Sequence, residues 1–271
     1  MAIAATGIYM AAMMSACQTG NETALNPQTP ATISDRNAKT ADILLIKDGG
    51  KDLAYATVGR PVLWKEIDQS LNSFWEFTYT AQNVTATKYN QTTKQQMDVD
   101  LYTLDANGLC TQSSTDKVFN YEYNVNGQLT KCYNKFEPNE RQEFAYENDP
   151  AAQTKSLSKV TFYDKFNIKK REITYSYTAG GVIPDLNPMN PECLPTNGRK
   201  YLPIFGKFNT NLAKLVTDNT FLSSGTKLMT AFLYEYALDA DGRANTVTLK
   251  KTDGTIISVT QRKYSSPVGG I

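Results

Sequence analysis

VFNYEYNVNGQLTKCY, residues 118–133, is the stretch that decides the fold. Aromatic and polar side chains alternate in its first half, with Phe119, Tyr121 and Tyr123 on one face. This period of two is typical of a β-strand with one face in water. A hairpin dipeptide, Asn126-Gly127, follows and readily takes the positive φ angles of a two-residue turn. The stretch therefore predicts two antiparallel strands joined by a tight turn.

The same signals recur along most of the chain. Ile173, Tyr175 and Tyr177 alternate with polar residues, and so do Ile257 and Val259. Further hairpin dipeptides stand at Asn107-Gly108, Asp241-Gly242 and Asp253-Gly254. Since a hairpin buries one face and needs neighbours to complete a core, residues 43–264 are predicted to form one all-β domain of about 12 to 14 antiparallel strands.

A short internal repeat accompanies the turns. Each copy has an aromatic or aliphatic residue, a turn-forming Asp or Asn, two spacers and a residue that tolerates positive φ. The copies are Leu104–Gly108, Tyr123–Gly127 and Tyr163–Asn167, with a looser fourth copy in Tyr234–Tyr236 followed by Asp241–Arg243. The repeat predicts a hairpin unit that curls into a barrel or rolled sheet.

One region interrupts the alternation. Prolines recur through residues 180–203, at Pro184, Pro188, Pro191, Pro195 and Pro203. Proline removes a ladder donor and breaks helices, so this region is predicted to be a long surface loop. Ile204, Phe205, Phe208, Leu212 and Leu215 follow at near-helical spacing. They predict one short helix over 204–215 that covers an open end of the sheet.

Composition excludes several classes of function. The chain has 28 Lys and Arg against 27 Asp and Glu, so it lacks the basic field that draws proteins to nucleic acid. It has no His, which removes Ser/His/Asp and Cys/His catalysis and the common zinc and haem sites. We therefore expect no nucleic-acid partner, no cofactor and no metal.

The N-terminus has the layout of a secretion signal. Residues 1–16 are apolar, too few for a spanning helix, and end in small residues before Cys17. Met14–Cys17 resembles the bacterial lipobox, which implies acylation of Cys17; the alternatives are an ordinary secretory signal or an apolar leader with an incidental Cys. Residues 17–42 are rich in Thr, Asn, Ala and Pro and predict a flexible tether, and 265–271 are predicted to be a C-terminal tail. These features predict a lipoprotein of the cell envelope that is anchored to the outer membrane by its acyl group alone.

The remaining cysteines carry little chemistry. Cys110, Cys132 and Cys193 have no C-x-x-C spacing, so no metal site is expected. Cys110 and Cys132 could pair across neighbouring strands in an oxidising envelope, or all three could be small buried side chains. The sequence leaves the two readings open.

The whole arrangement resembles a family of Bacteroidetes lipoproteins of unknown function with a porin-like fold. The resemblance spans roughly residues 43–264 and is carried by YEYNVNGQLTK at 121–131, LPIFGKFNTNLAKL at 202–215 and YEYALDADGRANTVTL at 234–249. The turn repeat is also distantly similar to the tyrosine/aspartate (RHS-type) repeats of large bacterial shell-forming proteins, as at Tyr163-Asp164. The resemblance implies a curved or closed antiparallel barrel and brings no known activity.

Two acidic clusters are candidate sites. Asp239 and Asp241 alternate as in a calcium loop, but Arg243 stands where an EF-hand needs an oxygen ligand, so a hairpin turn is favoured. Asp98, Asp100 and Asp105 form the second cluster. The first two share a strand face, and paired carboxylates could serve glycoside hydrolysis. Asp on a wet strand face is more often solubilising.

An aromatic cluster is the candidate binding site. Trp64, Trp75, Phe77 and Tyr79 could form a platform on which a sugar ring stacks. The last three share one strand face, where they would equally well pack the sheet. The platform and the core remain alternatives.

Three functions are compatible with the sequence. The first is a non-catalytic envelope lipoprotein that binds a protein or glycan partner, and the second is a carrier that holds a small apolar or sugar ligand in the barrel. A carboxylate-based glycoside hydrolase is the third and least favoured. A filled interior would favour the binding module, and a large aromatic cavity the carrier. Charged residues such as Glu122 and Glu172 lie in mid-strand opposite the aromatic stripes, so we expect a water-soluble barrel and no pore.

Overall fold

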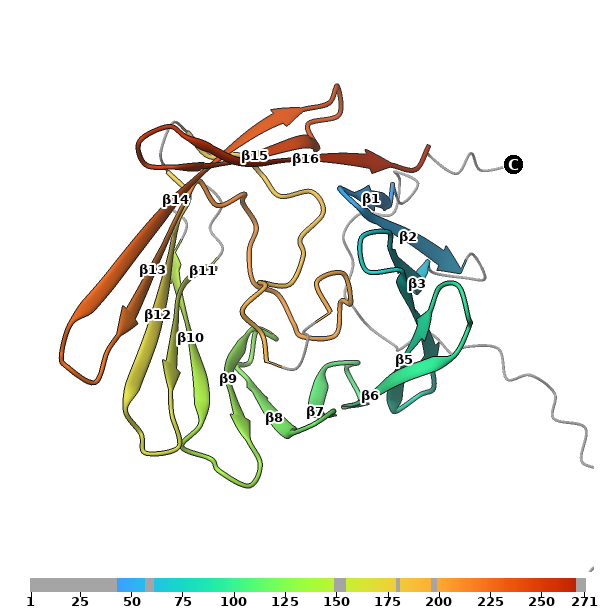
Figure 1. Cartoon of the computed structure of the whole chain (residues 1–271), viewed down its shortest axis with the longest axis horizontal. Coiled ribbons are helices and arrows are strands. Elements are labelled where there is room, and N and C mark those ends of the chain that lie inside the picture. Colours follow the sequence, from blue (N-terminus) through green and yellow to red (C-terminus); the bar gives the residue numbers. More distant parts are fainter. Residues whose placement is uncertain (1–42, 57–60, 149–154, 179–180, 196–198, 267–271) are drawn as a thin grey trace, which may run out of the picture.

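The computed structural model describes residues 43–56, 61–148, 155–178, 181–195 and 199–266. The predicted leader, residues 1–16, and tether, residues 17–42, lie outside these ranges. Sixteen strands in the described residues form one closed antiparallel barrel, in which each strand pairs with the next along the chain and β16 pairs with β1 (Figure 1). The predicted all-β antiparallel fold is therefore confirmed, with more strands than the 12 to 14 expected.

The strands follow one another as a simple meander. Their bounds are β1 Leu45–Asp48, β2 Lys51–Ala56, β3 Val62–Asp68, β4 Ser73–Tyr79, β5 Asn83–Asn90, β6 Gln96–Leu104, β7 Cys110–Ser114, β8 Val118–Tyr123, β9 Leu129–Asn134, β10 Arg141–Asn148, β11 Lys155–Tyr163, β12 Lys169–Ser176, β13 Leu215–Phe221, β14 Lys227–Leu238, β15 Ala244–Lys251 and β16 Ile256–Tyr264. No helix in the described part of the chain is long and apolar enough to cross a membrane.

The internal repeat forms one kind of turn. In the turn between β6 and β7, Asp105 Oδ1 accepts hydrogen bonds from the backbone N–H groups of Asn107 and Leu109. Asn124, Asp164 and Asp239 make the same pair of bonds two and four residues ahead. The fourth residue of each turn has positive φ, and these are Gly108, Gly127, Asn167 and Gly242. The side chain of the Asx residue therefore replaces part of the backbone ladder at each turn. Asp239 caps the turn of the fourth copy. The acidic cluster that contains it, which was compared with a calcium loop, is therefore a hairpin turn.

The side chains of each strand alternate between a face that points into the lumen and a face that points outward. Trp75, Tyr102, Tyr121 and Phe144 are buried on the lumen face. The outer face carries cross-strand ion pairs, since residues directly opposite each other share a face. Lys65–Glu76 at 3.0 Å and Glu122–Lys131 at 3.8 Å are directly opposite each other in mid-strand. Glu235–Lys250 at 2.6 Å is a diagonal pair between β14 and β15. The outer wall is thus charged on several sides of the barrel.

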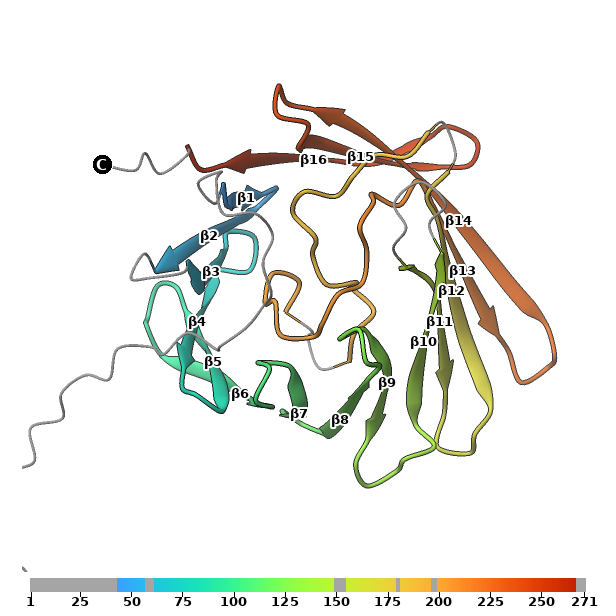
Figure 2. The same ribbon diagram turned by 180° about the vertical axis from the view of Figure 1, so that it is seen from behind.

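The proline-rich segment between β12 and β13 lies inside the barrel, which corrects the prediction of a surface loop. Both views place it within the ring of strands (Figures 1 and 2), and we call its described residues, 181–195 and 199–214, the plug. Leu194, Leu202, Phe205 and Phe208 of the plug belong to the same buried cluster as the wall residues. A barrel of this many strands is too wide for its own wall side chains to fill. The plug supplies the missing core.

The helix predicted over 204–215 is also wrong. Cys110 N–H donates to Ile204 O and Leu157 N–H to Phe208 O, so the backbone of this stretch bonds to the wall and not to itself. Gly206 has φ +88°, which a helix does not allow. Ile204, Phe205 and Phe208 belong to the buried cluster that the plug shares with the wall, whereas Leu215 begins β13.

Tyrosine hydroxyls fasten the barrel at the end where the plug enters. At that end, paired strands diverge. For example, Gln112 to Ser114 of β7 pair with β8, whereas Cys110 of β7 and Tyr123 of β8 lie beyond the last hydrogen-bonded pair. Tyr123 spans the opening and donates to Cys110 O at 2.8 Å. Six other tyrosines in the described residues make equivalent bonds at 2.5 to 3.0 Å: Tyr55 to Leu45 O, Tyr79 to Leu63 O, Tyr146 to Leu129 O, Tyr177 to Leu157 O, Tyr236 to Ala213 O and Tyr264 to Ala244 O. Burial raises the pKa of Tyr55 to about 12, which keeps that hydroxyl protonated as a donor.

Candidate functional site

The aromatic residues singled out in the sequence do not lie on one surface. Trp75 is 7% exposed and Phe77 6%, both within the lumen core. Tyr79 is one of the tyrosines that bridge diverging strands. Trp64 alone of the four is exposed, at 40%. The four residues therefore do not form one platform at the surface. That Trp64 alone binds a sugar ring stays a prediction.

The acidic residues in and directly after β6 have different roles. Asp98 is exposed, Asp105 caps a turn, and Asp100 is 0% exposed beneath the plug. Asp100 Oδ2 lies 2.6 Å from Arg199 Nη2 and accepts a hydrogen bond from Tyr102. Burial raises the pKa of Asp100, and the guanidinium of Arg199 opposes that rise. The two carboxylates therefore do not converge on one accessible point.

Arg199 is the first anchor of the plug in the lumen. Its guanidinium carbon lies 3.1 Å from the ring centroid of Trp75, while its Nη2 bonds to Asp100. The arginine is thus held between an aromatic face and a carboxylate, an arrangement that suits a planar cation. Arg199 lies in a proline-rich segment that was predicted to be a surface loop, so no sequence pattern indicated its role in the lumen.

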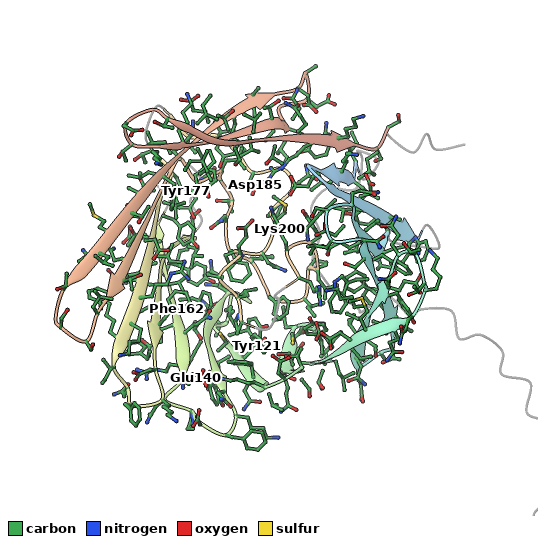
Figure 3. All side chains as sticks on the ribbon, viewed as in Figure 1. Tyr121, Glu140, Phe162, Tyr177, Asp185 and Lys200 are labelled. Carbon is green, nitrogen blue, oxygen red and sulfur yellow. The ribbon has the colours of Figure 1, made fainter. Side chains whose placement is uncertain are left out.

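Asp48 on β1 is the second anchor. Lys200 Nζ lies 3.0 Å from Asp48 Oδ2, Arg262 Nε lies 2.9 Å from Oδ1, and the Tyr201 hydroxyl donates to Oδ2. Figure 3 shows Lys200 inside the ring of strands. Burial alone would raise the pKa of Asp48, but the charges of Lys200 and Arg262 and these hydrogen bonds outweigh it and lower the pKa to about 2. Three consecutive plug residues are therefore bound to two strands, β6 and β1, that lie far apart in the sequence.

The cysteines are thiols within the described structure. Cys110, Cys132 and Cys193 are free, so the pairing of Cys110 with Cys132 is not formed. Burial raises the pKa of Cys193 to about 11 and that of Cys132 well above its usual range. Such thiols are protonated at neutral pH and are poor nucleophiles. No group of three His, Cys, Asp or Glu side chains in the described ranges is placed to hold a metal ion.

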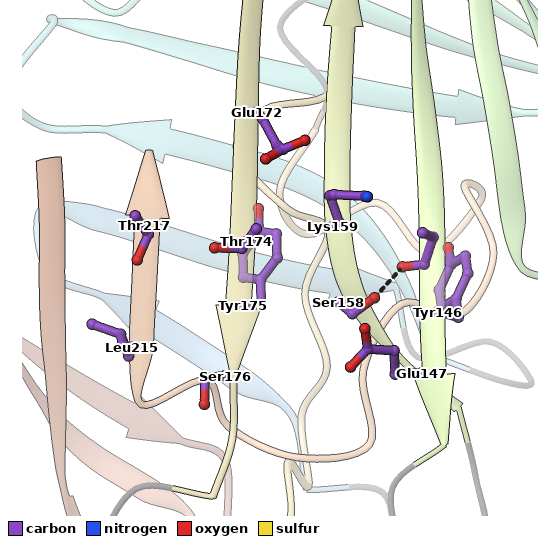
Figure 4. Close-up of a pocket in the computed structure, with 11 residues that line it drawn as sticks. Tyr146, Glu147, Ser158, Lys159, Glu172, Thr174, Tyr175, Ser176, Leu215 and Thr217 are labelled. Atoms are coloured by element: carbon purple, nitrogen blue, oxygen red, sulfur yellow. Dashed lines mark hydrogen bonds between the residues drawn. The ribbon is translucent and has the colours of Figure 1, made fainter. Parts of the chain in front are cut away.

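A cleft on the outer wall is the candidate site. It has a volume of about 620 Å³ and spans β10 to β13 (Figure 4). It lies where β11 and β12 separate, beyond their last pair, Lys159 with Thr174. We call it the β10–β13 cleft. Small outward side chains make the wall hollow here, since Ala145, Thr174 and Thr217 stand where other parts of the wall carry Lys and Glu.

The lining of the β10–β13 cleft is mainly polar. Four hydroxyl side chains come from three strands: Ser158, Thr174, Ser176 and Thr217. Glu147, Lys159 and Glu172 add charges, and Glu172 is itself paired with Lys169 at 2.5 Å. Two phenol rings, Tyr146 and Tyr175, reach the cleft from strand positions that face the lumen. These side chains can both donate hydrogen bonds to a polar ligand and accept hydrogen bonds from it.

Comparison with known proteins finds similarity of fold. No protein-family model matches this chain, and no curated protein matches it. A porin-like protein from Bacteroides uniformis ATCC 8492 is 13% identical, with a TM-score of 0.42 over 82% of this chain and 97% of that chain. A porin-like protein from Bacteroides vulgatus ATCC 8482 is 11% identical, with a TM-score of 0.49 over 82% of this chain and 98% of that chain. The likeness concerns the barrel and leaves the lipoprotein and repeat-family assignments as predictions.

Proposed function

We propose that this protein is a non-catalytic binding module of the cell envelope, whose lumen is closed by its own plug and whose outer wall meets a protein or glycan partner. The observation that carries the proposal is the filled lumen. Leu202 and Phe205 of the plug are fully buried against the wall, and Arg199 is paired there with Asp100. A carrier needs an internal ligand cavity and a pore needs an open channel, and the plug occupies that space.

The charged side chains of the outer wall are evidence that the barrel lies in water. A Lys or Arg on the lipid face of a membrane barrel costs roughly 2 to 4 kcal/mol at mid-depth. Lys65 and Lys131 lie in mid-strand on the outer face, each with a carboxylate opposite, and Lys250 lies near the end of β15 on the same face as Glu235. Their combined cost in lipid would approach the net stability of a typical domain. The membrane contact that we propose is the acyl group on Cys17 alone.

A hydrolase has less support. A general acid needs a raised pKa together with access to substrate. Among the described carboxyl groups, burial raises the pKa of Asp100 and of Asp185. Asp100 is sealed beneath Arg199, and Asp185 lies half-buried in the plug, where its Oδ1 accepts a hydrogen bond from the backbone N–H of Asn187. The charge of the whole chain, +1, likewise gives no net positive field to attract nucleic acid.

Three measurements test the proposed function. Native mass spectrometry of the purified full chain should give the mass of the chain and its lipid with no other bound molecule, and planar bilayers exposed to it should show no conductance. A copurifying small molecule within the barrel would favour the carrier, and stable ion conductance would overturn the proposal. Location is tested with a clickable palmitate analogue in cells, which should label the wild type and not Cys17→Ala.

A further inference from the structure

We infer that the β10–β13 cleft is a carbohydrate site that takes neutral sugar units. This inference rests on the proposed function, because it names the class of partner that the outer wall would bind. Its volume of about 620 Å³ falls within the range of ligand pockets, which is about 300 to 1,000 Å³. Because it lies outside the lumen, a ligand can reach it without displacing the plug.

The hydroxyl groups of the cleft are available to a ligand. Among the described residues, Thr174, Ser176 and Thr217 have no side-chain hydrogen-bond partner, whereas Ser158 donates to Ala145 O. Each hydroxyl both donates and accepts, as each sugar hydroxyl does. The carboxylates of Glu147 and Glu172 can accept further bonds and Lys159 can donate. The cleft therefore matches a ligand that carries many hydroxyl groups.

Charge and polarity argue against other small ligands. Two carboxylates and one ammonium line the cleft, so an anion would meet a net negative charge. Ala145 and Leu215 are the aliphatic side chains of the lining, and Tyr146 and Tyr175 reach it only from positions that face the lumen, so an apolar ligand would find little aliphatic surface to bury. A neutral polar ligand remains.

An extended peptide is also disfavoured. Peptides add to a sheet through unpaired backbone groups at a strand edge. Beside the cleft, the N–H of Leu157 already donates to Phe208 O, and its carbonyl accepts from Tyr177. The plug thus occupies the edge of β11 that a peptide strand would use.

The test is calorimetric titration of the purified full chain with maltose, cellobiose, lactose and mannobiose. Glucuronic acid and an uncharged hexapeptide of alternating Ser and Val are the rival probes. We expect saturable binding of at least one neutral disaccharide. The double variant Thr174→Val/Thr217→Val should weaken it about tenfold or more, because two hydroxyl partners are lost without a change of shape.

Two further variants complete the design. Ala145→Gln fills the cleft from β10 and should also weaken binding, which keeps the test decisive should the double variant not fold. Thr248→Val removes an outward hydroxyl of β15, outside the cleft, and should leave binding unchanged. Failure of all four disaccharides to bind, binding equally strong in the cleft variants, or binding of the rival probes alone would each overturn the inference. A chain that binds no sugar yet shows an empty native mass and no conductance would leave the proposed function intact.

Discussion

Arg199 and Asp100 form a buried ion pair that joins the plug to the barrel wall, with Nη2 and Oδ2 2.6 Å apart. The arginine is 6% exposed and the aspartate 0%. They come from a proline-rich segment and from β6, so the pair is a long-range contact that exists only in the tertiary fold. A buried charge without its partner is costly, whereas loss of both partners can be nearly neutral.

We predict that Arg199→Met lowers the free energy of unfolding by about 3 kcal/mol, because it leaves the Asp100 carboxylate buried and unpaired. The double variant Asp100→Leu/Arg199→Met should recover most of that loss. Urea unfolding followed by circular dichroism measures both. If the double variant were less stable than Arg199→Met, the pair would not be the contact described here.

Asp48 predicts how stability depends on acid. Its pKa is lowered from 3.8 to about 2 in the folded chain, so its carboxylate stabilises the fold above the unfolded value of 3.8 and loses that effect as pH falls towards 2. The shift corresponds to about 2 kcal/mol. Asp48→Asn should therefore be about 2 kcal/mol less stable than wild type at pH 6 and nearly equal at pH 2. A difference that is constant with pH would contradict this assignment.

Gly206 tests how closely the plug approaches the wall. Its φ is +88°, and an added Cβ would lie 2.4 Å from the carbonyl oxygen of Gly127. Gly225 has a similar φ, +82°, with nothing within 4 Å of an added Cβ. Both Ala variants carry the backbone strain of about 1 kcal/mol, so the difference between them reports the clash alone. We expect Gly206→Ala to melt well below Gly225→Ala; equal melting temperatures would show that the plug does not touch this turn.

The tyrosines that bridge diverging strands should each contribute measurably. Tyr123→Phe and Tyr146→Phe keep the ring and remove the donor to a backbone carbonyl, which should cost about 1 kcal/mol each. Tyr163→Phe is the control, because its ring stacks with Arg141 at 3.9 Å and that contact survives loss of the hydroxyl. Chemical denaturation of the three variants makes the comparison. Equal stabilities would mean that these bonds merely replace bonds to water.

The local part of the fold could be predicted from the sequence because it depends on neighbouring residues. A turn forms at Asn126-Gly127 as expected, but it runs from Asn124 to Gln128 with positive φ at Gly127 alone, so the predicted two-residue type is wrong. The alternation of Phe119, Tyr121 and Tyr123 forms the expected strand. The plug could not be predicted in this way. Proline-rich segments usually lie at surfaces, and only closure of sixteen strands creates a space that such a segment must fill.

The candidate site depends on register even more strongly. Ala145, Thr174 and Thr217 are unremarkable small residues on three different strands, and pairing alone brings them together on one face. The aromatic residues, in contrast, were visible in the sequence, but their alternation could not tell the lumen from the outer face. Trp75 and Phe77 proved to face the lumen.

The central claim is that the plug fills the lumen, and hydrogen exchange of the native chain tests it most directly. The amides of Leu202, Ile204 and Leu212 are hydrogen-bonded inside the barrel, so peptides covering 200–212 should exchange as slowly as the strands around them. The turn at 222–226 provides the fast reference. Exchange of the plug peptides as fast as this turn would show that the segment lies at the surface and that the lumen is open.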